Sequence, residues 1–240
     1  MTAPSFAVVI PTRDRLALLR ECLEAVAAQT LRPSEVVVVN DAGEDISRVA
    51  DGLDLPVRLL RIELSTGGSA ARNRGVRATS AEWVALCDDD DLFSPDHLET
   101  LARALTASPA GLAYTDAHAF DADPARPVGI LDRDFDRDLL RTTNYIAPST
   151  VAFRRARYDQ LQGLDESLPN YWDWDFFLRM SEVAPVTRAP GGHTFYRLHA
   201  GSAQLVVPPP VRAAQLQRLC DKHGLGTLPL KHLFDLFRRT

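Results

Sequence analysis

The sequence predicts an α/β protein built on a doubly wound, mostly parallel sheet flanked by helices. Strand-like and helix-like segments alternate over about the first ninety residues, which is the pattern of βαβ crossovers. Segment 35–39 carries four successive valines, typical of a strand buried on both faces. Four consecutive aspartates at 88–91 follow another apolar run, at the strand end where such sheets place ligands.

Hydrophobic periodicity gives the elements of the first half in chain order. The predicted strands are 6–10, 35–39, 57–62 and 83–87. Leu16, Leu19 and Leu23 recur at helical spacing, which predicts a helix that ends near Gln29. The other helices predicted here are a weak one through Ile46 and Val49 and a short one over 69–79.

The second half has a different pattern. Ser94-Pro95-Asp96 has the features of a helix start, with a capping serine, a proline at the first helical position and an acid in the first turn. It predicts a helix through Leu98, Leu101 and Leu105. Residues 116–138 are rich in aspartate and are expected to form a loop, and the alternating charges over 132–138 are interpreted as a solvated face.

Two further helical regions are expected toward the C-terminus. Phe176, Phe177 and Met180 indicate a helix that also contains Asp173 and Asp175. Prolines 208–210 form a stiff break, and one or two helical pieces are expected after it.

Composition excludes several functional classes. The net charge of −5 argues against nucleic acid as a partner. The three cysteines are far apart and show no metal or disulfide spacing, which fits a reducing cytoplasm. We expect no secretory signal and no membrane-spanning segment, since the N-terminus has no basic-then-apolar pattern and no apolar run is long enough. The oligomeric state stays open.

The aspartate run is the main chemical signal. Adjacent carboxylates repel one another unless a cation compensates, and oxygen ligands suit a hard divalent cation. A solvated acidic turn is the alternative. Thr12-Arg13-Asp14 and Asn40-Asp41 also follow predicted parallel strands, so we expect the three segments to converge on one crevice. That convergence favours the cation site.

These segments together resemble family 2 glycosyltransferases with the GT-A fold, over about residues 5–205. The segments that match, in the order that the family has them, are Val8–Arg15, Gln29-Thr30, Glu35–Asp41, Gly67–Gly75, Leu86–Asp91, Gly163–Glu166, Trp172–Asp175 with Arg179, and Tyr196–His199. The resemblance implies a nucleotide-sugar half at 1–91 and an acceptor half at 92–205, with a smaller acceptor-side subregion. Residues 206–240, beyond the resemblance, are expected to form a C-terminal helical extension.

The resemblance also implies an activity: inverting, metal-dependent transfer of a sugar from a nucleoside-diphosphate sugar to a hydroxyl of a saccharide or lipid-linked acceptor. Mn²⁺ or Mg²⁺ would stabilise the diphosphate leaving group, and UDP or dTDP is weakly favoured. Its implied nucleotide contacts are Pro11, Thr12, Arg13, Asn40, Asp41, Gly68, Arg72, Asp88 and Asp89. Its implied metal ligands are Asp90, Asp88, Asp91 and His199. Because Asp89-Asp90-Asp91 also spells D-x-D, the metal register stays open.

On the acceptor side the resemblance implies that Asp173 is the general base, with Asp175 as the rival. Read without the family, Asp173 fits a helix cap or first-turn acid better than a base, and the family context reverses that preference. The implied acceptor contacts are Trp172, Trp174 and Asp175.

Two alternative functions stay open, and so does one kind of partner, a membrane surface. A sugar-nucleotide nucleotidyltransferase would have a glycine-rich loop after its first strand, whereas residues 11–15 contain no glycine. A non-catalytic binding protein on this fold would have lost the carboxylates. The amphipathic, basic-ended tail 230–239 fits packing on the domain or peripheral contact at the inner face of a membrane.

Overall fold

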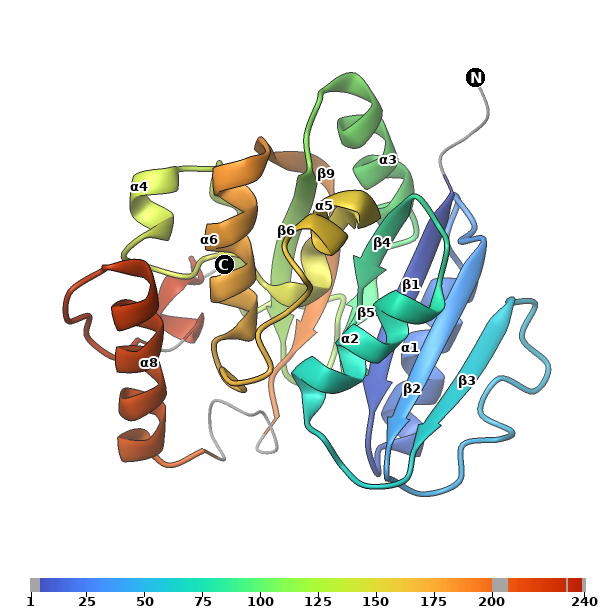
Figure 1. Ribbon diagram of the computed structural model, residues 1–240. Helices are drawn as coiled ribbons and strands as arrows, with labels where there is room; N and C mark the ends of the chain where they lie inside the picture. The colour runs from blue at the N-terminus through green and yellow to red at the C-terminus, as the bar shows by residue number, and fades with distance from the viewer. Residues whose placement is uncertain (1–4, 200–206, 232, 239–240) are drawn as a thin grey trace.

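The computed structural model describes residues 5–199, 207–231 and 233–238 (Figure 1). The strands are β1 (Phe6–Thr12), β2 (Glu35–Asp41), β3 (Val57–Ile62), β4 (Trp83–Leu86), β5 (Leu92–Phe93), β6 (Leu112–Phe120), β7 (Gly129–Leu131), β8 (Val151–Arg154) and β9 (Val186–Arg197). The helices are α1 (Leu16–Ala27), α2 (Gly68–Ala78), α3 (His97–Ala107), α4 (Arg137–Leu140), α5 (Arg155–Gln160), α6 (Trp172–Val183) and α8 (Pro209–His223). Short 3-10 turns lie at Pro148–Thr150 and Leu233–Leu236.

Within these described ranges, nine strands form one sheet in the order β3-β2-β1-β4-β8-β6-β9-β5, with β7 on β6. The first four strands of this order are parallel, and Thr12 is in register with Asn40. Their carboxyl ends therefore share one edge of the sheet. β8 runs antiparallel to both β4 and β6, and β9 then runs parallel to β6. The predicted mixed α/β architecture with a mostly parallel central sheet is confirmed.

The sheet separates two hydrophobic cores. Alternate residues of β1 point to opposite faces, as strand geometry requires: Val8 packs in the core with α1 and α3, whereas Val9 packs in the core with α2 and α6. Figure 1 shows α2, α5 and α6 in front of the sheet and α1 behind it. Gly75 lies where a Cβ would come within 2.5 Å of Val9 and 3.1 Å of Val39. A larger residue there would push α2 away from β1 and β2.

Two expectations were wrong. Residues 46–49 form turns rather than a helix, although Ile46 and Val49 are buried as the pattern implied. The expected loop at 116–138 contains the end of β6 and all of β7. Its first acid, Asp116 in β6, is held by Arg188 on β9 at 2.7 Å, and that distant pairing lets a charged residue lie within a strand.

The alternating segment 132–138 is largely exposed, as interpreted from the sequence, and its charges also make specific contacts. Asp132 bonds Arg238 and Asp134 bonds Arg188, each at 2.9 Å. Asp136 caps α4 by accepting from the Leu139 N–H. The segment is therefore tied to β9, to the C-terminal residues and to its own helix.

The helix expected after the proline break is present. α8 starts at Pro209, directly after the proline cap Pro208, and buries Leu216 and Leu219 in the α2–α6 core. Leu236 and Phe237 pack partly buried against the same core. The expected boundary at 205/206 lies outside the described residues. No helix in the described part of the chain is long and apolar enough to cross a membrane.

Candidate active site

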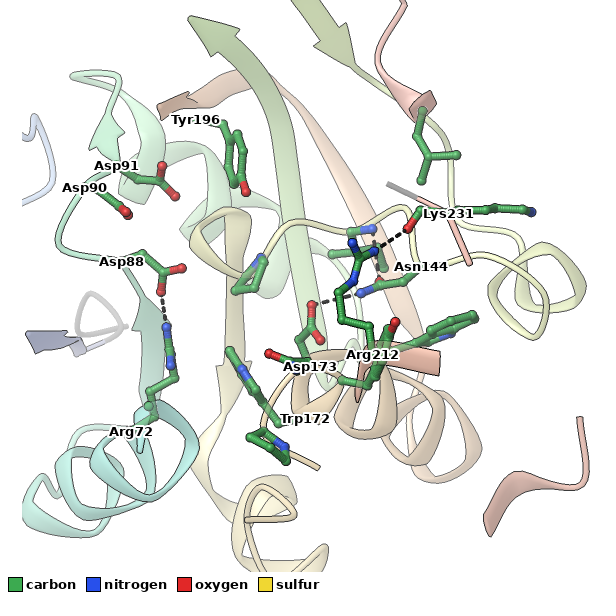
Figure 2. Close-up of a pocket in the computed structure, with 18 of the residues that line it drawn as sticks. Arg72, Asp88, Asp90, Asp91, Asn144, Trp172, Asp173, Tyr196, Arg212 and Lys231 are labelled. Carbon is green, nitrogen blue, oxygen red and sulfur yellow. Dashed lines mark hydrogen bonds and ion pairs between the residues drawn. The ribbon is translucent and has the colours of Figure 1, made fainter. Parts of the chain in front are cut away.

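A cavity of about 350 Å³ opens at the carboxyl edge of the parallel strands (Figure 2). Its walls come from the ends of β1 and β4, the start of α2, the loop 142–148, the start of α6, the end of β9, and the C-terminal segment. These pieces lie far apart in the sequence. The topology brings them to one edge, as the strand-end argument predicted.

The aspartate turn forms immediately after β4. The Asp91 N–H bonds the Asp88 carbonyl at 3.1 Å, and the Asp88 N–H bonds the hydroxyl of Ser149 at 2.9 Å. In this turn one carboxylate oxygen each from Asp88, Asp90 and Asp91 lie within 4.8 Å of one another. Asp89 turns aside and accepts from the Thr12 hydroxyl at 2.7 Å.

Arginine and histidine side chains of the chain itself surround this cluster. Arg15 Nη1 lies 2.7 Å from Asp90 and 3.1 Å from Asp89. His199 Nε2 lies 2.7 Å from the same Asp90 oxygen, and Arg72 bonds Asp88. The contacts to the turn thus come from the residue before α1, from α2 and from the residues after β9, and the two arginines among them offset part of its negative charge.

Burial and mutual repulsion act on the acids of this turn. Burial, with Asp90 close by, raises the pKa of Asp89 to about 6, although Thr12 and Arg15 oppose the rise. Burial and then the charges of Asp90 and Asp88 raise the pKa of Asp91 well above its ordinary value. A bound cation would reverse both effects, since it favours the ionised carboxylates.

The donor set fits a hard divalent ion. Three carboxylates within one coordination sphere are the oxygen-rich arrangement that Mg²⁺ and Mn²⁺ accept. The oxygens that converge belong to Asp88, Asp90 and Asp91, whereas Asp89 serves Thr12 and Arg15. His199 contacts Asp90. Its ring nitrogen could bind the metal ion directly only by giving up that contact; otherwise it acts on the metal through the Asp90 carboxylate.

The residues expected to contact nucleotide fall into two groups. Pro11, Gly68 and Arg72 line the cavity with Asp88 and Asp89. Thr12 supports Asp89 from behind the cavity wall.

Arg13, Asn40 and Asp41 lie outside the lining. Arg13 is exposed and donates to Ser65. The amide of Asn40 is used within its own turn, donating to the Glu44 carbonyl and accepting from the Gly43 N–H. Burial alone would raise the pKa of Asp41, but hydrogen bonds from residues 65–67 outweigh it and hold that pKa below its ordinary value. Asp41 therefore fixes the loop that leads into α2.

Asp173 lies in the first turn of α6 and lines the cavity. Its Oδ2 accepts from Asn144 Nδ2 at 2.8 Å. Burial raises the pKa of Asp173 to about 6, against hydrogen bonds from the Trp174 backbone and Asn144. A carboxylate with this pKa is ionised at neutral pH and accepts a proton more readily than an ordinary aspartate.

Aromatic rings frame this carboxylate. Trp172 stacks under Arg72, whose guanidinium carbon is 4.3 Å from the ring centroid. Trp174 also lines the cavity, and its indole N–H donates to the Leu140 carbonyl at 2.6 Å. Trp172 thus connects the aspartate side of the cavity to Asp173 (Figure 2).

Asp175, two residues further along α6, lies elsewhere. It is fully buried, and its contacts are Arg179 at 2.6 Å, Lys222 at 2.6 Å and His223 at 2.8 Å. Burial alone would raise the pKa of Asp175, but these partners lower it to about 2. It is not part of the cavity lining. This geometry fits a structural ion-pair centre between α6 and α8, not the expected acceptor contact or rival base.

Sequence reasoning missed Asn144, Arg212 and Lys231. Asn144 comes from the segment 116–145, where no motif marked it. Arg212 and Lys231 come from α8 and from the segment after it, and both line the cavity. A single sequence gives no signal for them, because each reaches the cavity only through the tertiary packing of the C-terminal extension.

Comparison with known proteins adds independent findings. The model of the family described as glycosyl transferase family 2 matches residues 7–161. The chain is 36% identical over 233 residues to the uncharacterized glycosyltransferase YwdF of Bacillus subtilis, covering 94% of this chain and 86% of the relative. It is 32% identical over 187 residues to the O-antigen biosynthesis protein RfbC of Myxococcus xanthus, which covers 75% of this chain but 15% of RfbC.

Solved structures show the same fold. S. aureus TarS 1–349 in complex with UDP-GlcNAc has a TM-score of 0.74 and 18% identity, covering 91% of this chain and 66% of the TarS chain. The same region of TarS in complex with UDP has a TM-score of 0.68. The mixed sheet described above is therefore the central sheet of the GT-A fold.

Proposed function

The chain belongs to glycosyl transferase family 2, and from this premise we propose that it transfers a sugar from a UDP-sugar to a hydroxyl of a saccharide or lipid-linked acceptor, with inversion. One observation carries the proposal: a triad of carboxylates and a separate, half-buried carboxylate, Asp173, open into the same cavity. Such transfer needs a leaving-group end and a base end, facing each other across the reacting carbon. We call the side with Asp88, Asp90 and Asp91 the donor end, and the side with Trp174, Arg212 and Lys231 the acceptor end.

At the donor end, Asp88, Asp90 and Asp91 would hold Mg²⁺ or Mn²⁺. When bound, the ion would stabilise the negative charge that develops on the departing nucleoside diphosphate. Arg72 and Arg15 already lie against these carboxylates, so both can contact phosphate oxygens once the diphosphate arrives. UDP is favoured because TarS, which shares the fold, is described with UDP and UDP-GlcNAc.

At the middle of the cavity, Asp173 would accept the proton of the attacking hydroxyl. Asn144 holds its Oδ2, so the other oxygen can face the acceptor. Trp172 offers an apolar ring beside this position, and such rings pack well on sugar faces. The three cysteines are free and buried, and a reducing cytoplasm is the compartment we propose.

The test begins with ligand binding. Thermal unfolding would be followed with UDP, GDP, dTDP and CDP, each with and without Mn²⁺ or Mg²⁺. At a hundredfold excess over its Kd a ligand stabilises the folded state by about 2.7 kcal/mol. UDP should raise Tm most, and only with the metal. A folded protein that no nucleotide stabilises, with or without metal, would contradict the proposal.

Turnover would then be assayed as UDP release from UDP-sugars. A nucleotidyltransferase would instead release pyrophosphate from a nucleoside triphosphate. The relatives and the matched family do not favour that alternative.

A further inference from the structure

The acceptor end carries a pair of cations that the family match does not reach. Arg212 lies in the first turn of α8, and Lys231 lies between α8 and the last 3-10 turn. Both are beyond residue 161, where the match ends. Both line the cavity, and Figure 2 shows them across Asp173 from the aspartate cluster.

Packing fixes the two cations relative to each other. Arg212 is 5% exposed, and its Nη2 donates to the Lys231 carbonyl at 3.2 Å. Lys231 Nζ donates to the Thr143 hydroxyl at 2.7 Å and lies 3.5 Å from the Thr142 carbonyl. Arg212 thus anchors the segment that presents Lys231, and Lys231 in turn anchors the loop beside Asn144.

Charge is distributed unequally along the cavity. Among its described lining residues, the carboxylates are the four aspartates of the donor end and Asp173. The Lys231 ammonium donates to a hydroxyl and lies near a carbonyl, both uncharged. A guanidinium stays ionised even when buried, so the acceptor end keeps a positive charge on the side of Asp173 away from the aspartate cluster (Figure 2), near the proposed position of the attacking hydroxyl.

We propose that the acceptor carries an anionic group, a phosphate or a carboxylate, close to the hydroxyl that receives the sugar, and that Lys231 and Arg212 bind it. The inference rests on the proposed function, because Asp173 must mark the position of the hydroxyl. Nucleotide and metal occupy the donor end, so the rest of the acceptor extends toward α8. Hydrogen bonds from charged donors to phosphate or carboxylate oxygens are among the strongest available there.

The experiment uses the full chain saturated with UDP and Mg²⁺, so that anionic probes cannot occupy the donor end. Calorimetric titrations would compare glucose 1-phosphate, glucuronate and glucose. The phosphate and carboxylate probes should bind more tightly than glucose, and the ratio between them identifies which anion is preferred. Lys231→Gln should weaken binding of the preferred anion about tenfold and leave the binding of glucose unchanged.

Two further variants keep the result interpretable. Arg218 is exposed on α8, so Arg218→Gln removes the same charge from the helix surface and should change no titration. Arg212→Gln should weaken anion binding as Lys231→Gln does. Lys231 is exposed, so its variant should fold even if the buried Arg212 variant does not.

Three outcomes would overturn the inference: glucose binding as tightly as both anions, Lys231→Gln leaving anion binding intact, or no anion binding at millimolar concentration. Each is read after UDP binding has been measured in the same protein. Failure to bind UDP contradicts the proposed function, whereas UDP binding without anion binding contradicts this inference alone.

Discussion

At the donor end of the cavity the three converging carboxylates follow the carboxyl end of one parallel strand, β4, whereas at the acceptor end the side chains come from a loop, two helices and the C-terminal segment. The donor end is acidic, and Arg15, Arg72 and His199 lie against its carboxylates. The acceptor end is aromatic and cationic. Sheet topology alone therefore positions the chemistry of the leaving group, while selection of the acceptor depends on long-range packing. Each prediction below tests this division.

The largest effect is expected at the donor end. Asp90→Ala removes a carboxylate of the converging triad, and we expect sugar transfer to fall by more than about 10³-fold, with loss of metal-dependent stabilisation by UDP. Asp89→Asn should cost less than about tenfold, because Asp89 serves Thr12 and Arg15. Thermal shifts and initial rates measure both. Equal losses in the two variants would mean that the triad is not the metal site.

The next prediction distinguishes the proposed role of Asp173 from the role of the donor-end carboxylates. Asp173→Asn keeps the shape of the side chain but cannot accept a proton, so kcat should fall about 10³-fold. The Tm shift caused by UDP and metal should stay as in the parent protein. Turnover near that of the parent would remove Asp173 from the mechanism.

Asp175→Asn should act on stability instead. It breaks a buried centre that pairs with Arg179, Lys222 and His223, and we expect a loss of about 3 kcal/mol in the free energy of unfolding. Urea denaturation measures this loss, and kcat at a temperature where the variant is folded should be nearly unchanged. If kcat falls as in Asp173→Asn while stability holds, the two roles are reversed.

The pH dependence follows from the raised pKa of Asp173. Because that pKa is about 6, the base is ionised above pH 6 and becomes protonated below it. We expect kcat/KM to fall about tenfold per pH unit below pH 6. Asp89, whose pKa is also raised to about 6, is the control: the same fall should persist in Asp89→Asn.

The smallest effect concerns the support of the base. Asn144→Ala removes a hydrogen bond that lowers the pKa of Asp173, so the midpoint of the pH profile should rise and kcat near neutral pH should fall about fivefold. Asn170 also lines the cavity but bonds Gln215, so Asn170→Ala should leave the midpoint in place. An unchanged midpoint in Asn144→Ala would show that the amide does not tune the base.

The donor half could be predicted because local pattern and topology agree there. The valine run of β2 and the apolar runs before Pro11 and Asp88 mark parallel strands, and their ends define the crevice without any further information. The aspartates after β4 then follow as its charged wall. The family resemblance could be recognised from these segments together with shorter motifs of the acceptor half.

The acceptor half could not be predicted to the same depth. β6 contains Asp116, which belongs in a strand only because Arg188 pairs with it from β9. Asp173 and Asp175 are two residues apart on one helix and so point in different directions, but only the position of α8 decides which of them is buried among cations. Residues 46–49 met the apolar spacing of a helix, yet they form turns.

The pairing of Asp90 with Arg15 and His199, and of Asp88 with Arg72, has a consequence for how the enzyme is made. Structural zinc sites often leave their domains unfolded until the metal arrives. Here Arg15, Arg72 and His199, from three separate parts of the chain, already contact these carboxylates, so the aspartate turn can reach its native conformation during synthesis, before any cofactor is encountered. If the enzyme uses a metal ion as proposed, metal supply would set the fraction of active molecules, whereas the amount of folded protein would be set by the chain alone.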